Sequence, residues 1–184
     1  MQQPDLSALI RWPNVPACYG WLSLDRRGRW RLQGEPVTHQ GFIEFINRQY
    51  GCDEAGNWFL QNGPQRVFAA LEYTPWVLKL AGNGQLLTHT GSVLEAVREI
   101  LVDEDGALLF SFDEGIGVLD DRDLAAAYAL VTDPSGQTAS DDSLEAALAS
   151  GNWQGLCWQG LPLTAIARNT VAKRYGFNPA PKAD

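Results

Sequence analysis

A short turn motif, an aspartate followed three residues later by a glycine, recurs along this chain and limits the folds open to it. The copies are LDRRGRW, CDEAGNW, VDEDGAL and TDPSGQ, with their aspartates at Asp25, Asp53, Asp103 and Asp133. The carboxylate can accept hydrogen bonds from the backbone of its own turn, and glycine supplies the positive φ of a type I turn with a bulge. The motif therefore predicts hairpins along the length of the chain.

Short apolar segments around these turns predict nine strands. They are residues 20–24, 29–33, 57–61, 66–73, 76–80, 85–88, 99–103, 107–112 and 117–119. Strands this short and this closely spaced are typical of antiparallel sheet. Cys157, between Leu156 and Trp158, is also expected to lie in a strand.

Four segments with helical spacing interrupt the strands. The first is expected to begin at a Thr38 N-cap, to place Phe42, Ile46 and Tyr50 on one stripe and to end at Gly51. The fourth is expected to run from a Thr164 cap to Gly176, and the other two are considered next.

The second and third helices are expected in the C-terminal half. One begins at the acids Asp120 and Asp121 and has an inner face of Leu124, Tyr128 and Val131. In the other, Asp142 and Glu145 have capping-box spacing, and Gly151 is the expected stop. Together, strands and helices indicate an α+β fold of antiparallel sheets with about four helices.

The hexapeptide QGEPVT, at residues 33–38, returns as QGLPLT at residues 159–164. In both copies the interpretation is that a strand stops at Gln-Gly, proline fixes the next turn and threonine caps a helix. A structural duplication of the chain explains the repeat, and so do two independent corners of the same kind. The AGNGQ segment, residues 81–85, breaks the strands and divides the chain into units 1–82 and 83–184.

Charge and cysteine content exclude several function classes. The formal net charge is −8, so sequence-independent binding to nucleic acid or to an anionic membrane would be opposed by repulsion. Cys18, Cys52 and Cys157 form neither a zinc motif nor a disulfide framework, which indicates a reducing compartment. With neither a signal peptide nor a membrane span apparent, the expected location is the cytoplasm.

Residues 20–80 resemble uncharacterised proteobacterial proteins classed as domains of unknown function. The resemblance rests on the order Asp-x-x-Gly-x-Trp, Gly-x-Pro-apolar, a helix, a second Gly-x-Trp and a Thr-Pro before a strand. The segment is also distantly similar to a family with two repeated units like pleckstrin-homology domains. That resemblance implies two related units and a role in signalling, and it brings no catalytic residues.

Enzyme chemistry finds little support in the residue pattern. A hydrolase or transferase using one of the cysteines with His39 or His89 is the alternative function, but no nucleophile elbow or oxyanion loop accompanies them. The acids between Asp113 and Asp123 lack the spacing of a metal loop, and glycine-rich nucleotide motifs are missing. We therefore expect no catalytic residues, no metal and no cofactor.

The candidate ligand-binding residues are four arginines in the first hairpin. Arg26 and Arg27 lie at its tip, and Arg29 and Arg31 alternate on one face of the following strand. Such a patch could hold phosphate or another anion, while pairing with surface carboxylates is the structural alternative. The function expected from the sequence is a non-enzymatic binding or regulatory module that recognises a protein segment or an anionic ligand. Trp12 and Trp153, in loop-like contexts, are expected to be available to a partner, and the sequence leaves the oligomeric state open.

Overall fold

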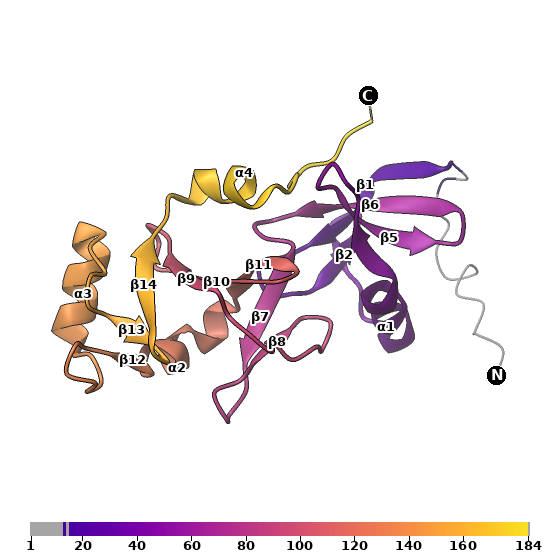
Figure 1. The fold of residues 1–184 in the computed structure, drawn as a ribbon. Coiled ribbons are helices and arrows are strands. Elements are labelled where there is room, and N and C mark those ends of the chain that lie inside the picture. Colours follow the sequence, from indigo (N-terminus) through magenta and orange to yellow (C-terminus); the bar gives the residue numbers. More distant parts are fainter. Residues whose placement is uncertain (1–12, 14, 184) are drawn as a thin grey trace. The chain divides into compact units, whose positions relative to one another are not determined.

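The computed structural model describes Pro13 and residues 15–183 of the chain, and its fold is α+β (Figure 1). Packing divides the described residues into two compact units. The first contains the residues up to Asp25, Arg29–Glu72 and those from Asn178 onward, whereas the second contains Arg26–Gly28 and Tyr73–Phe177. Each unit has its own sheet and its own helical elements.

The first unit is built on a six-stranded sheet with the order β3-β2-β1-β6-β5-β4. Its strands are β1 (Ala17–Leu24), β2 (Trp30–Leu32), β3 (Glu35–Pro36), β4 (Tyr50–Cys52), β5 (Trp58–Asn62) and β6 (Gln65–Leu71). Helix α1 (Gln40–Gln49) follows β3 and buries Phe42 and Ile46, which lie four residues apart on one helix face. The expected apolar stripe of this helix is thus confirmed at these two positions.

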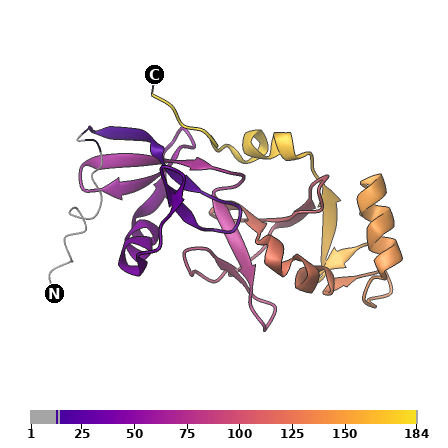
Figure 2. The ribbon, with the colours of Figure 1, turned by 180° about the vertical axis from the view of Figure 1, so that it is seen from behind.

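The second unit contains an eight-stranded sheet with the order β12-β13-β14-β9-β10-β11-β7-β8. Its strands are β7 (Trp76–Leu80), β8 (Leu86–Thr88), β9 (Glu99–Val102), β10 (Leu108–Phe112), β11 (Gly115–Leu119), β12 (Val131–Thr132), β13 (Cys157–Trp158) and β14 (Leu161–Ala165). Its helices are α2 (Leu124–Tyr128), α3 (Asp141–Ser150) and α4 (Val171–Tyr175), with the 3-10 turns η2 (Asp121–Asp123) and η3 (Arg168–Thr170). Figures 1 and 2 both show α3 beside the β13–β14 hairpin.

The Asp-x-x-Gly turns form as the sequence predicts. In each, a carboxylate oxygen of the aspartate accepts a hydrogen bond from the backbone N–H four residues later, at 2.8–3.1 Å. The backbone N–H of the same aspartate donates to the carbonyl of that residue, and the four glycines have φ between 72° and 81°. The turns at Asp25, Asp53 and Asp103 join neighbouring antiparallel strands, as expected for hairpins.

All nine predicted strands are present, with ends shifted by a few residues, and Cys157 lies in β13 as expected. The sheets, however, are mixed. Most strand pairs are antiparallel, as the sequence predicts, whereas the pairs β1–β6, β7–β11 and β9–β14 are parallel. A turn motif predicts only the hairpin that it closes. Parallel strands are joined by long connections, and packing decides which of them pair.

Neither predicted threonine cap is formed. The N-cap of α1 is His39, whose Nδ1 accepts a hydrogen bond from the backbone N–H of Phe42 at 3.2 Å, so Thr38 lies one residue too early. Thr164 lies inside strand β14, where it pairs with Leu101 of β9. The fourth helical segment begins only after β14, because pairing with β9 provides this stretch with backbone hydrogen bonds that a helix would otherwise supply.

Three further helix boundaries differ from the expectation. Helix α1 ends at Gln49, and Gly51 is paired within β4. The helix that begins near Asp120 stops before Val131, which lies in β12. Ser140, rather than Asp142, caps α3 by accepting from the N–H of Ser143, whereas Gly151 ends α3 with φ 68°, as predicted.

The Gln-Gly-x-Pro repeat forms the same local structure twice, but this structure is a hairpin rather than a strand-to-helix corner. Gln33-Gly34 connects β2 to β3, and Gln159-Gly160 connects β13 to β14. All four of these residues have positive φ, as in a two-residue type I′ turn. Val37 donates its backbone N–H to the carbonyl of Trp30 at 2.8 Å, and Leu163 donates to the carbonyl of Leu156 at 2.9 Å.

Residues 81–85, where the sequence suggests a domain boundary, form the turn between β7 and β8 of the second unit. The chain passes from the first compact unit to the second between Glu72 and Tyr73. Separate folding of residues 1–82 and 83–184 remains a prediction.

Candidate functional site

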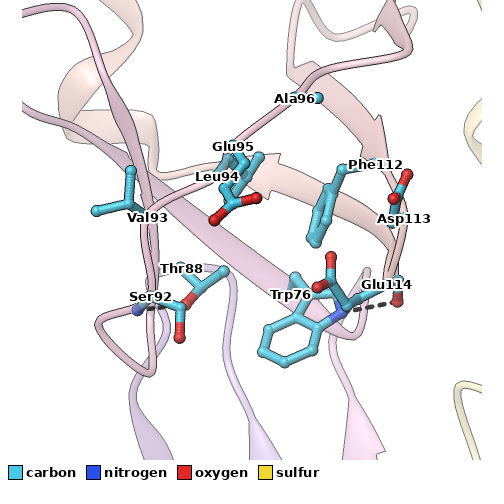
Figure 3. A pocket seen from close by; sticks show the side chains of 10 residues that line it. All are labelled: Trp76, Thr88, Ser92, Val93, Leu94, Glu95, Ala96, Phe112, Asp113 and Glu114. Atoms are coloured by element: carbon cyan, nitrogen blue, oxygen red, sulfur yellow. Dashed lines mark hydrogen bonds between the residues drawn. The ribbon is translucent and has the colours of Figure 1, made fainter.

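A pocket of about 330 Å³ opens in the second unit (Figure 3). Three of its walls come from regular structure: Trp76 at the start of β7, Thr88 at the end of β8 and Phe112 at the end of β10. The remaining lining residues lie in the segment after β8 and in the β10–β11 turn: Ser92, Val93, Leu94, Glu95, Ala96, Asp113 and Glu114.

Backbone hydrogen bonds hold the segment after β8 in place. Leu94 donates its N–H to the carbonyl of Leu86 at 2.9 Å, and Thr88 donates to the carbonyl of Ser92 at 2.8 Å. The Thr88 hydroxyl also accepts from the Ser92 N–H at 3.1 Å. Residues 92–94 therefore run beside β8, and the chain then continues along the pocket to Glu95 and Ala96.

Two aromatic rings form an apolar wall of the pocket. The centroids of Trp76 and Phe112 are 6.2 Å apart, with the planes inclined at 55°. The indole N–H of Trp76 donates to the backbone carbonyl of Glu114 at 3.1 Å, which fixes the ring against the β10–β11 turn. Figure 3 shows this hydrogen bond and both rings facing the same space. Faces of such rings attract cations through their quadrupoles.

The carboxylates around the pocket differ in orientation. In Figure 3 those of Glu95 and Glu114 project into the space beside the rings, whereas Asp113 lies at the outer edge. Asp113 forms an ion pair with Arg98, with the Nη2–Oδ1 distance 2.6 Å, and so part of its charge is already compensated. The interior of the pocket consequently has negative character.

His89 lies behind the aromatic wall, and its ring centroid is 5.7 Å from that of Trp76. Its Nδ1 accepts a hydrogen bond from the backbone N–H of Val77 at 3.3 Å. Burial, with a smaller contribution from the positive charge of Lys79, lowers the pKa of His89 to about 3. The imidazole is therefore neutral near pH 7 and adds no positive charge to the pocket.

The four arginines singled out in the first hairpin make several contacts with the protein itself. Arg29 and Arg31 of the first unit both form ion pairs with the buried Asp25, at 2.8 and 3.3 Å. In the second unit, Arg27 donates two hydrogen bonds of 2.8 Å to Asp121.

The guanidinium of Arg26 lies over the ring of Tyr73, 5.0 Å from its centroid. An anion at this patch would compete with the intramolecular ion pairs of Arg27, Arg29 and Arg31. Ligand binding by the four arginines remains a prediction.

The surroundings of two of the cysteines disfavour ionisation of the thiol. Burial raises the pKa of Cys18, and burial together with the neighbouring Asp53 raises that of Cys52, which disfavours the reactive thiolate. Cys157 is half-buried in β13.

Within residues 13 and 15–183, no three histidine, cysteine or acidic side chains cluster in a way that could hold a metal ion. Strand β11 separates Asp113 from Asp120, as expected, and Asp120 caps η2 through its side chain. In the same part of the chain, no helix has the length and apolar character to cross a membrane.

Two expectations about tryptophans have different outcomes. Trp153 is only 4 % exposed and stacks on Tyr128, so most of its ring is packed in the protein, and contact with a partner remains a prediction. Trp12 lies outside the described residues. The residues that line the pocket were not identified from the sequence, because Trp76 and Phe112 have the pattern of ordinary core positions, and Glu95 lies in a segment without a motif.

The fold and pocket define an α+β protein of two compact units with a cavity in the second. A family model matches residues 1–182, and the chain belongs to that family, DUF2944, described as "Protein of unknown function (DUF2946)". A comparison with curated proteins finds no match.

Two solved structures are similar to this chain. One is a DUF1285 family protein from Silicibacter pomeroyi, 18 % identical, with a TM-score of 0.49, covering 72 % of this chain and 79 % of its own. The other is a DUF1285 family protein from Shewanella baltica, 16 % identical, with a TM-score of 0.44, covering 58 % of this chain and 89 % of its own.

Proposed function

We propose that this protein is a non-enzymatic binding module that recognises a protein segment by accepting a lysine or arginine side chain in the pocket of Trp76 and Phe112. The observation that carries the proposal is the combination of two aromatic rings with the inward carboxylates of Glu95 and Glu114 around one cavity. Rings attract a cation over their faces, and carboxylates pair with it at the rim.

The dimensions and charge of the cavity favour this ligand class over others. A volume of about 330 Å³ is at the lower end of the usual range for small-molecule sites, which suits one long side chain. An anion would meet the negative potential of Glu95 and Glu114, and the neutral His89 offers it no counter-charge. A purely apolar ligand would leave both carboxylates without a partner.

The test compares two blocked pentapeptides, one with a central arginine and one with a central citrulline. Citrulline has nearly the same shape but no charge, so the pair isolates the contribution of the cation. We expect the arginine peptide to shift the NMR signal of the Trp76 indole N–H in a saturable manner. We expect the citrulline peptide to bind at least about fivefold more weakly, since exposed ion pairs and cation–π contacts contribute about 0.5–1 kcal/mol each.

Three neutralising substitutions provide the matched controls. Glu95→Gln and Glu114→Gln together should weaken the arginine peptide by roughly 5- to 30-fold, at about 0.5–1 kcal/mol for each carboxylate. Asp113→Asn, next to Glu114 but paired with Arg98 at the outer edge, should change it by less than about twofold. Equal binding of both peptides, or an equal effect of all three substitutions, would show that the pocket does not recognise a cation.

Recognition of an anionic ligand by Arg26, Arg27, Arg29 and Arg31 is the second candidate. Its support is the density of positive charge in one hairpin of a chain with net charge −8. Titration with inorganic phosphate at low and moderate salt, in the wild type and in an Arg26→Glu, Arg27→Glu double variant, tests it. Binding that is lost in the double variant and weakens with salt would support the patch, and equal affinities would remove it.

We further propose the cellular setting that the sequence suggests. The module belongs to a regulatory or signalling process in the cytoplasm of a proteobacterium, and residues 1–82 and 83–184 are related pleckstrin-homology-like units. The resemblance described for residues 20–80 supports the family setting, and the lack of a disulfide framework supports the compartment. Fractionation of native cells with an antibody against the protein tests the location.

A further inference from the structure

A second concave surface, here called the α2–α3 groove, lies in the same unit and has a different character. It encloses about 360 Å³ and is lined by residues of α2, α3, the Asp103 turn and the segment after α3. Its apolar lining residues are Leu124, Tyr128, Leu144, Leu148 and Trp153, and its acidic ones are Asp105, Asp141 and Glu145. Apolar groups therefore make up the greater part of the groove, and acids surround them.

Helix α3 contributes one complete face to the groove. Asp141, Leu144, Glu145 and Leu148 follow the spacing of neighbours along a helix surface, whereas Ala147 is the buried position of this helix. Leu148 is 42 % exposed, which places a large apolar side chain at the surface. This face of α3 thus lines the groove, and Ala147 and Leu144 pack the helix on the core beside it.

Fixed aromatic residues form the opposite side of the groove. The Tyr128 hydroxyl donates to the carbonyl of Gly106 at 2.9 Å, and the rings of Tyr128 and Trp153 are stacked with centroids 6.1 Å apart. Trp153 is almost fully buried, so its position is set by the core. The groove therefore needs little rearrangement to accept one or two apolar side chains.

The charge around the groove selects the kind of partner. Between Glu99 and Ala167 the sequence contains thirteen acidic residues and one basic residue, Arg122, which pairs with Asp120. Asp105 forms an ion pair with Arg168, whereas Asp141 and Glu145 form none with any residue that the structure describes. A partner that carries positive charge beside its apolar residues would complement this rim.

Charge also decides which of the ligands that such a groove could bind is favoured. A second copy of the chain, docked through the same face of α3, would bring Asp141 and Glu145 against acids of the same kind. An anionic membrane would be repelled in the same way. A basic amphipathic segment of another protein meets both the apolar floor and the acidic rim.

We propose that the α2–α3 groove docks a basic amphipathic helix of a partner protein, with one or two large apolar anchors beside Leu148 and lysine or arginine beside Asp141 and Glu145. Helices that lay an apolar face into a groove are a common mode of peptide recognition. The groove shares no residue with the pocket of Trp76. This inference can therefore fail while the proposed function holds, and the proposed function can fail while this inference holds.

The probe is a helical peptide of about fourteen residues that contains only leucine and lysine, with leucine on one face. A second peptide has alanine in place of leucine and the same charge, and a third has glutamate in place of lysine. We expect the leucine-lysine peptide to bind at least about tenfold more tightly than either control, because each control removes one of the two complementary features. NMR shifts on binding should map to α3 and Trp153 rather than to Trp76.

Matched variants of the protein locate the site. Leu148→Asp should weaken the leucine-lysine peptide about tenfold, whereas Leu130→Asp, at an apolar residue of similar exposure (40 %) outside the groove, should change it less than about twofold. Glu145→Lys should weaken it more than Glu54→Lys, which makes the same change in net charge at an exposed turn of the first unit. Thermal unfolding of each variant establishes that it is folded before the comparison is made.

The opposite results overturn the proposal. They are equal binding of the three peptides, equal effects of Leu148→Asp and Leu130→Asp, or NMR shifts outside the groove. Sedimentation equilibrium tests the second copy: a dimer that Leu148→Asp dissociates would assign the groove to self-association and exclude the partner helix.

Discussion

Gln33 and Gln159 share a left-handed backbone conformation, with φ of 48° and 47°, at the same position of two hairpins in different compact units. Among the described residues they are the only non-glycine residues with positive φ. Each is followed by a glycine that also has positive φ, and each begins a copy of the Gln-Gly-x-Pro repeat. The repeat therefore encodes a two-residue turn, and this turn is the structure that its two copies share.

Substitution at Gln33 should change stability through the backbone alone. Asparagine tolerates the left-handed region, so Gln33→Asn should raise the free energy of unfolding by up to about 1 kcal/mol, and Gln33→Val should lower it by about 1 kcal/mol or more. Gln33 is a better position for this test than Gln159. The side chain of Gln159 donates a hydrogen bond to the carbonyl of Gly84, so a substitution there would change stability through a lost hydrogen bond as well. Urea unfolding measures both changes, and an opposite order of the two variants would contradict the turn assignment.

The start of α1 offers a comparison of two neighbouring residues. Because His39 accepts a hydrogen bond from the N–H of Phe42, His39→Ala should lower the free energy of unfolding by about 0.5–1 kcal/mol. Thr38→Ala should change it by less than about 0.5 kcal/mol, since Thr38 lies outside the cap. Thermal unfolding of the two variants decides between these positions, and a larger loss at Thr38 would restore the cap predicted from the sequence.

Gly117 in β11 has no room for a side chain. A Cβ at this position would lie 2.7 Å from Cγ of Leu78, a fully buried residue of the core. Gly117→Ala should therefore lower the free energy of unfolding by about 1–3 kcal/mol through overpacking. Gly82→Ala is the control, because a Cβ there would meet nothing within 4 Å, and it should be nearly neutral in the same denaturation measurement.

The buried His89 should make stability depend on pH in acid. Its pKa falls from 6.5 to about 3 on folding, because burial disfavours the charged imidazolium. Between these values the unfolded chain binds the proton and the folded chain does not, so the contribution of His89 to stability is lost as the pH falls from 6.5 toward 3. The slope contributed by one such group approaches about 1.4 kcal/mol per pH unit.

His89→Gln provides the measurement of this effect. The difference in unfolding free energy between the wild type and this variant should shrink, or change sign in favour of the variant, as the pH falls from 7 to 5. Urea unfolding at several pH values yields this difference directly, and the titration of carboxylates common to both proteins cancels. A difference that stays constant over this range would show that the folded protein binds the proton at His89 as readily as the unfolded chain.

The sequence alone determined the local structure. Asp-x-x-Gly turns, short apolar strands and the Gly151 helix stop all follow from interactions between residues close in the chain, and each is found where it was expected. The same reasoning failed where a distant partner competes with a local signal. Thr164 is the example, because its pairing with Leu101 in β9 overrides a plausible helix cap.

Only the tertiary structure decided the candidate sites. The pocket unites Trp76, Glu95 and Phe112 from three separate stretches, and the α2–α3 groove unites the Asp103 turn with two helices. The parallel pairings β7–β11 and β9–β14 bring these segments together across long connections, and such pairings leave no mark in local spacing. Local chemistry selects each turn and strand, whereas the burial of apolar surface among distant segments selects which of them become neighbours.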